Sequence, residues 1–142
     1  MRDTFWIALG GALGTTARYW IALWAMPISR QVPAGTILIN IVGSFVIGFV
    51  GTLTLENGRY PLPDTARLFL MVGFCGGFTT FSSFSLQTLD LIRTGALDRA
   101  LINIVVSVVF CLGAVAAGHG LASLLNGGSA AIAETVTEEE AG

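Results

Sequence analysis

One segment near the middle of the chain combines glycine, hydroxyl and phenyl groups in a pattern suited to ion binding. Residues 73–85 read GFCGGFTTFSSFS. Glycine is a poor helix former, and a helix that unwinds inside hydrocarbon must have its freed backbone groups satisfied by protein, water or ions. Freed carbonyls suit a hard cation such as Na⁺, whereas exposed N–H groups suit an anion. The alternative is a continuous helix whose hydroxyls bond back to carbonyls four residues earlier. In that helix Phe78, Phe81 and Phe84, spaced by three, would pack as a stripe on one face.

Two other polar side chains interrupt apolar segments. Asn40 is the strongly polar residue deep within residues 35–51, and its amide offers hydrogen-bond donors as well as an acceptor. It acts either as a link between helices or as a donor to a permeating species. Arg18 lies within the first apolar segment, where an arginine is costly and is a functional candidate. It either extends to the membrane interface or attracts anions in a vestibule.

The composition indicates that these residues belong to an integral membrane protein. The 142 residues are 54% hydrophobic and 11% charged, with a net charge of −2, whereas a soluble domain is about 25% charged. The mean hydropathy is +0.77. This balance disfavours a disordered chain, a disulfide scaffold, a nucleic-acid binder and an ordinary water-soluble enzyme.

Four apolar segments, separated by charged residues, predict an all-α membrane protein with four transmembrane helices. A spanning helix needs about 20 apolar residues. We expect helices over about 4–25, 33–55, 66–90 and 98–125, with the third broken near mid-membrane, so that residues 1–125 form one domain. Residues 126–142 are small, polar and acidic, and we expect them to be a disordered tail.

The arginines give almost no orientation bias under the positive-inside rule. Arg2, Arg59 and Arg67 lie on one side of the predicted topology, and Arg30, Arg93 and Arg99 on the other. Either a small excess still sets one orientation, or the chain inserts both ways and pairs antiparallel with itself. Four short helices enclose little space, so a channel of this size should be an oligomer.

The remaining residues suggest packing rather than catalysis. Gly10 with Gly14, and Gly73 with Gly77, form GxxxG pairs that favour close helix contacts. We interpret Cys75 and Cys111 as small packing residues and His119 as an interfacial side chain. The predicted span interiors contain no Asp, Glu or Lys, and no catalytic set is recognisable, so we do not expect an enzyme.

Three motifs, in order, resemble the Fluc/CrcB family of small fluoride ion channels: GGALGTTARY at 10–19, GTILIN at 35–40 with Gly43 following, and GFCGGFTTFSSF at 73–84. The resemblance covers about residues 5–125. It implies an antiparallel, dual-topology homodimer in the bacterial inner membrane, with two fluoride pores and a structural sodium ion at its centre. Such channels let fluoride leave the cell passively. The implied partners are fluoride, a second copy and membrane lipid, and no nucleic acid.

The resemblance also assigns roles to residues at matching motif positions. Backbone carbonyls of Gly76 and Thr79 would hold the sodium ion, and Arg18 would lie near a vestibule. The residues that would line the fluoride pore are Asn40, Thr80, Phe81, Ser82, Ser83, Phe84, Asn103 and Ser107. A phenyl ring edge carries partial positive charge, which would suit Phe81 and Phe84 to a passing anion.

The sequence departs from the family pattern at several of these positions. Ser83 stands where the family often has threonine, and Asn103 where many relatives have tyrosine. Cys111 and Val115 stand where the family pattern has hydroxyl side chains. The row of polar pore residues that includes Asn103 and Ser107 is therefore interrupted at these two positions.

Two other functions compete with a channel. A small multidrug exporter would need a membrane-embedded glutamate, and residues 5–55 hold none. The other alternative is a structural membrane subunit without transport activity.

Overall fold

The computed structural model describes residues 2–56 and 59–127, and within these residues the regular structure is entirely helical. This confirms the predicted all-α class. The long helices are α1 (Arg2–Trp24), α2 (Ala34–Leu53), α5 (Phe81–Arg93) and α6 (Leu97–Leu125). The short elements are η1 (Met26–Ile28), α3 (Asp64–Arg67), η2 (Leu68–Cys75) and α4 (Gly76–Phe78).

The helix boundaries lie close to those predicted from hydropathy. The helices expected over 4–25, 33–55 and 98–125 correspond to α1, α2 and α6, and the one expected over 66–90 corresponds to the run from α3 to α5. By length and composition, three described segments are able to cross a membrane: Ala34–Leu53, Asp64–Arg93 and Leu97–Leu125. The acidic tail was predicted over 126–142, and its residues 128–142 lie outside the described residues.

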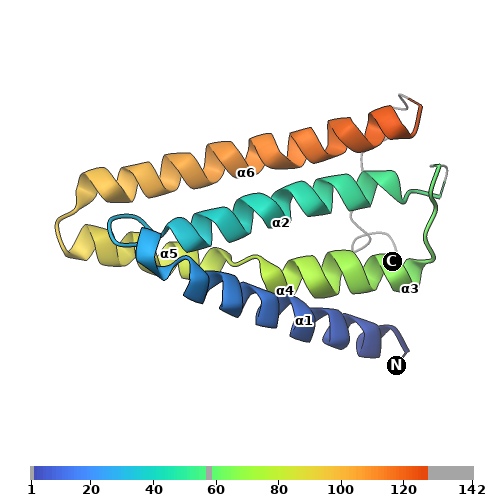
Figure 1. Ribbon diagram of the computed structural model, residues 1–142, viewed down its shortest axis with the longest axis horizontal. Helices are drawn as coiled ribbons and strands as arrows, with labels where there is room; N and C mark the ends of the chain where they lie inside the picture. The colour runs from blue at the N-terminus through green and yellow to red at the C-terminus, as the bar shows by residue number, and fades with distance from the viewer. Residues whose placement is uncertain (1, 57–58, 128–142) are drawn as a thin grey trace, which may run out of the picture.

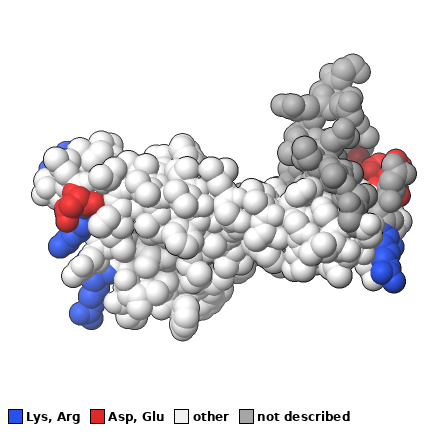
Figure 2. Space-filling view, turned by 90° about the horizontal axis from the view of Figure 1, so that it is seen from above, with Lys and Arg blue, Asp and Glu red and all other residues white. Residues whose placement is uncertain are grey.

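Helix α2 runs between α6 and the segmented helix formed by α3, η2, α4 and α5 (Figure 1). Helix α1 packs along η2 and α4. Charged side chains lie at the two ends of the molecule on the face shown in Figure 2, and the band between them is uncharged. This distribution is that of a protein whose middle lies in hydrocarbon and whose ends lie in water.

Glycines allow α1 to approach the third helical segment closely, as the two GxxxG pairs predicted. A Cβ atom on Gly10 would lie 3.1 Å from the Cα atom of Gly73, and one on Gly77 would lie 3.0 Å from the Cα atom of Gly11. A Cβ on Gly14 would collide with the carbonyl of Phe74. The backbones therefore touch where larger residues would hold the helices apart.

A second set of glycines joins α2 to α6. A Cβ on Gly48 would meet the backbone of Val115, and one on Gly118 would lie 2.8 Å from the amide nitrogen of Phe49. Since α2 carries the polar residue Asn40, this contact also fixes where Asn40 lies.

The C-terminal end of α2 is held by side chains from its neighbours. The buried Arg67 donates from Nη1 to the carbonyl of Gly51 (3.2 Å) and to Oγ1 of Thr54 (2.9 Å). His119 Nδ1 lies 2.9 Å from Oγ1 of Thr52, near the end of α6. Arg67 thus satisfies a carbonyl that the end of a helix would otherwise leave free.

Replacing Gly118 with alanine should loosen the contact between α2 and α6. Overpacking of this kind costs about 1–3 kcal/mol, so we expect Gly118→Ala to lower the melting temperature of the detergent-purified protein. Gly120→Ala is the matched control, because a Cβ at Gly120 meets no atom within 4 Å. Equal melting temperatures for the two variants would contradict the packing argument.

Candidate functional site

The third helical segment is broken, as predicted, but the break lies beyond its glycines. Gly76 and Gly77 keep helical geometry within α4. Thr79 (φ −81°, ψ 160°) and Thr80 (φ −154°, ψ 109°) are extended, and α5 begins at Phe81. A stretch of π-helix over Leu68–Cys75, which the sequence did not reveal, precedes the break.

The break is held open by a side chain from another helix. Asn40 on α2 donates from Nδ2 to the carbonyl of Thr80 (3.1 Å) and accepts from the amide of Thr80 at Oδ1 (2.8 Å). The two bonds imitate the pairing that a neighbouring β-strand would provide. Asn40 therefore acts as a link between helices, which was one of the two roles predicted for it. Its Nδ2 group has two hydrogens, and the second remains available to another acceptor.

Two hydrogen bonds at the break, one to Asn40 and one to the Thr80 hydroxyl, leave two backbone carbonyls without their helical donors. In a continuous α-helix the amide of Thr80 would bind the carbonyl of Gly76, and the amide of Ser83 that of Thr79. Here the Thr80 amide donates to Asn40, and the Ser83 amide donates to Oγ1 of Thr80 (3.1 Å). The carbonyls of Gly76 and Thr79 are thus separated from their helical donors, and they are the ones that the family resemblance assigns to sodium.

Three hydroxyl groups gather at the N-terminus of α5. Thr80 is its N-cap residue, and its Oγ1 lies 3.2 Å from Oγ of Ser82 and 3.0 Å from Oγ of Ser83. Helix N-termini carry partial positive charge. The cluster joins three of the predicted site residues at an electropositive position.

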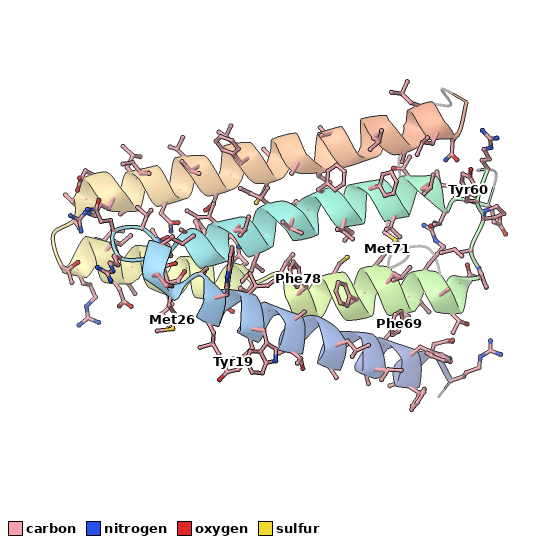
Figure 3. All side chains as sticks on the ribbon, viewed as in Figure 1. Tyr19, Met26, Tyr60, Phe69, Met71 and Phe78 are labelled. Atoms are coloured by element: carbon pink, nitrogen blue, oxygen red, sulfur yellow. The ribbon has the colours of Figure 1, made fainter. Side chains whose placement is uncertain are left out.

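A cavity of about 560 Å³ lies beside the break, between α2, η2, α5 and α6. Figure 3 shows Met71, one of its lining residues, between η2 and α2. Among the described residues, its walls carry no charged side chain. Seven predicted site residues line it: Asn40, Gly76, Thr79, Thr80, Phe81, Phe84 and Ser107.

The other predicted site residues lie outside the cavity wall. Ser82 and Ser83 stand behind Thr80 in the hydroxyl cluster, and Asn103 is fully buried. Arg18 lines no cavity wall described here, and its Nε is buried without a hydrogen-bond partner among the described residues. It lies one turn before Ala22, which lines a second cavity of about 540 Å³ at the end of the molecule.

Two further residues of the cavity wall, Cys111 and Ser44, extend the set predicted from the sequence. Cys111 lines the cavity, so its position belongs to the wall although it lacks the expected hydroxyl. Ser44 also lines it and was missed, although its spacing of four from Asn40 places it on the same helix face.

The alternative of a continuous helix with a stripe of three phenylalanines does not hold, because the chain is extended at Thr79 and Thr80. Phe78 is buried and stacks on Phe74, with ring centroids 5.8 Å apart. Phe81 is 78% exposed and lies beside Phe84, with centroids 5.4 Å apart. Phe78 is therefore a packing residue, and only Phe81 and Phe84 face the cavity.

Asn103 takes part in a buried chain of hydrogen bonds. Its Nδ2 donates to Oγ1 of Thr88 (2.8 Å), which donates to the carbonyl of Phe84 (2.7 Å). Thr88 was missed in the sequence, where it appears as an ordinary helical threonine. Its contact with α6 exists only in the folded chain.

The chain is similar to known proteins over most of its length. The sequence profile described as "CrcB-like protein, Camphor Resistance (CrcB)" matches residues 5–119. A protein of Gluconobacter oxydans named "Fluoride-specific ion channel FluC" is 62% identical over 136 residues, which is 95% of this chain and 94% of that protein. A protein with the same name from Methylobacterium radiotolerans is 58% identical, over 94% of this chain and 94% of its own length. Another from Rhodospirillum rubrum is 54% identical, over 86% of this chain and 95% of its own length. With most of its length matched by this profile and by these relatives, the chain belongs to the CrcB family.

Proposed function

We propose that this protein is a fluoride channel that lets fluoride leave a bacterial cell passively. The observation that carries the proposal is the uncharged cavity beside the helix break, whose wall combines amide, hydroxyl and phenyl groups. Relatives that are 54–62% identical are named as fluoride-specific ion channels. The protein is accordingly an ion channel and not an enzyme, and it crosses the membrane several times.

Neutral groups suit the passage of a small, strongly hydrated anion. A pore must replace the hydrogen bonds of water without holding the ion too tightly to leave. A positive charge in a narrow, low-dielectric cavity would trap fluoride, because Coulomb attraction grows steeply there. The Nδ2 hydrogen of Asn40 and the hydroxyl of Ser107 donate without this penalty, and the ring edges of Phe81 and Phe84 add a weakly electropositive surface.

The functional unit is an antiparallel homodimer whose subunits each cross the membrane four times. The cavity opens on the side of the molecule, where the wall residue Phe81 is 78% exposed. Polar backbone at the helix break is stable in a membrane only when protein or a water-filled space covers it, and a second copy would provide that cover. Arginines occur in similar numbers at the two ends, which supports insertion in both orientations. Helix α1, with 23 residues, is long enough to be the fourth span.

A sodium ion would be held by the backbone carbonyls of Gly76 and Thr79. The residues fit such an ion, because both carbonyls have lost their helical donors and hard cations prefer oxygen ligands. When bound, the ion would offset the partial negative charge of these carbonyls at the dimer centre. The space beside Gly76 is open, since no atom of the described chain lies within 4 Å of where its Cβ would be.

The experiment that tests the function is anion efflux from liposomes containing the purified protein, with fluoride and chloride electrodes side by side. Fluoride efflux without chloride efflux is the expected result. A folded dimer that releases no fluoride in the presence of Na⁺ would reject the channel and favour a structural membrane subunit.

Replacing either cavity phenylalanine should slow fluoride. Pairs of aromatic rings gain about 0.5–1.5 kcal/mol beyond their burial. For a ring-edge contact with fluoride of the same size, Phe81→Ile or Phe84→Ile should reduce fluoride efflux roughly two- to tenfold. Phe78→Ile is the comparison, because Phe78 packs away from the cavity. Full efflux from both cavity variants, purified as dimers, would reject a role for the ring edges.

A negative charge at Asn40 should block conduction. At an effective dielectric constant of 20, two charges 4 Å apart interact by about 4 kcal/mol, so Asn40→Asp should reduce fluoride efflux more than a hundredfold. The change also removes the bond to the Thr80 carbonyl. Ser44→Asp is therefore tested beside it, since it places a charge in the same wall and leaves that bond intact. Wild-type efflux from both variants would remove this wall from the ion path.

Sodium removal should destabilise the dimer. Exchange of Na⁺ for N-methyl-D-glucamine leaves the two carbonyls uncompensated, and each unsatisfied buried polar group costs about 1–3 kcal/mol. We expect a lower melting temperature that added Na⁺ restores in a saturable way. Identical melting curves in the two salts, measured at equal ionic strength, would argue against the sodium site.

A further inference from the structure

Three buried polar atoms on α6 lack hydrogen-bond partners among the described residues, and two of them lie one helical turn apart: Oδ1 of Asn103 and Oγ of Ser107, the third being Oγ of Ser123. Asn103 is fully buried and Ser107 is 6% exposed. Residues four apart on a helix are neighbours, with Cβ atoms about 5–6 Å apart. Two adjacent buried polar groups without partners indicate a place where a hydrogen-bonding species is held.

Thr88 determines which atom of the Asn103 amide is available to that species. The Thr88 hydroxyl has a single hydrogen, which it donates to the carbonyl of Phe84 at 2.7 Å. Toward Asn103, 2.8 Å away, it therefore acts only as an acceptor, and the atom facing it must be Nδ2. The remaining atom, Oδ1, is an acceptor, so it attracts a hydrogen-bond donor and repels a bare anion.

The hydroxyl of Ser107, like that of Ser123 on the same helix, does not bond back to a helix carbonyl as several other hydroxyls do. Thr16 and Ser85 donate to the carbonyls four residues earlier, at 2.8 and 2.9 Å. Ser107 makes no such bond within the described structure, although it lines the cavity. Its hydrogen is thus not consumed by the helix backbone.

We propose that Asn103 Oδ1 and Ser107 Oγ hold a water molecule in a site oriented by Thr88. The water donates one hydrogen to each oxygen, and two bonds of about 2.8 Å each are long enough to join neighbours one helical turn apart. The Ser107 oxygen then accepts from this water, and its own hydrogen points into the cavity as a donor. Asn103 and Thr88 are positioning residues, and Ser107 is the group that touches the ion. The water site stands on its own, whereas its effect on transport rests on the proposed channel function.

Paired substitutions at Thr88 test the orientation. Thr88→Val keeps the shape of the side chain but removes the acceptor for Asn103, whereas Thr88→Ser keeps that acceptor. Loss of one hydrogen bond corresponds to about a tenfold change, so fluoride efflux should fall about tenfold in Thr88→Val and return in Thr88→Ser. Equal efflux from the two variants would overturn the positioning role.

A double-mutant cycle separates positioning from general damage. If Thr88 acts through Ser107, the two substitutions are coupled and their effects are not additive. The double variant Thr88→Val with Ser107→Ala should then release fluoride less than about twofold more slowly than Ser107→Ala alone. Losses that multiply would overturn the proposed pathway from Thr88 to Ser107.

An NMR measurement of the Asn103 side-chain amide tests the proposed water site without measuring transport. In ¹⁵N-labelled protein in nanodiscs, the Asn103 side-chain amide signal should exchange slowly with solvent, shift in Thr88→Val and stay in place in Thr88→Ser. An amide signal that is the same in all three proteins would overturn the site. Wild-type protein that shows the expected signals but releases no fluoride would instead reject the channel function and support the site.

Discussion

The pair of hydrogen bonds between Asn40 and the backbone of Thr80 is the interaction on which the site depends. A helix broken inside hydrocarbon exposes N–H and C=O groups at high cost. The Asn40 amide satisfies one group of each kind, at 2.8 and 3.1 Å. In doing so it redirects the Thr80 amide and leaves the Gly76 carbonyl free. The break is therefore a defined structure held from outside the helix rather than a locally weak segment.

The close-packed glycines make this arrangement rigid. Gly48 and Gly118 bring α2 and α6 into backbone contact, and Gly10 and Gly73 do the same for α1 and η2. Close-packed helices have few alternative positions, because shifting one disturbs every contact along it. Asn40 is thus held at a fixed height relative to the break, which a hydrogen-bonded link between two helices requires.

The polar groups of the cavity wall are neutral, and under the proposed function their orientation would set the selectivity. Hydroxyl and amide groups donate or accept according to what their other partners demand. Thr88 fixes the Asn103 amide, and Thr80 gathers the hydroxyls at the start of α5. An anion in this cavity would meet donors arranged by the protein beforehand, so the protein need not reorganise around it.

The sequence by itself determined the helical class, the helix boundaries, the presence of a helix break and seven of the residues that line the cavity. Hydropathy and glycine content act locally, so they can be read along the chain, and the motifs from Gly10 to Phe84 added the family. Only the tertiary structure decided where the break falls, because Asn40 acts across forty positions of sequence. The same holds for the separation of Phe78 from Phe81 and for the Thr88–Asn103 bond. Each depends on which atoms of two helices meet, and spacing along one helix does not contain that information.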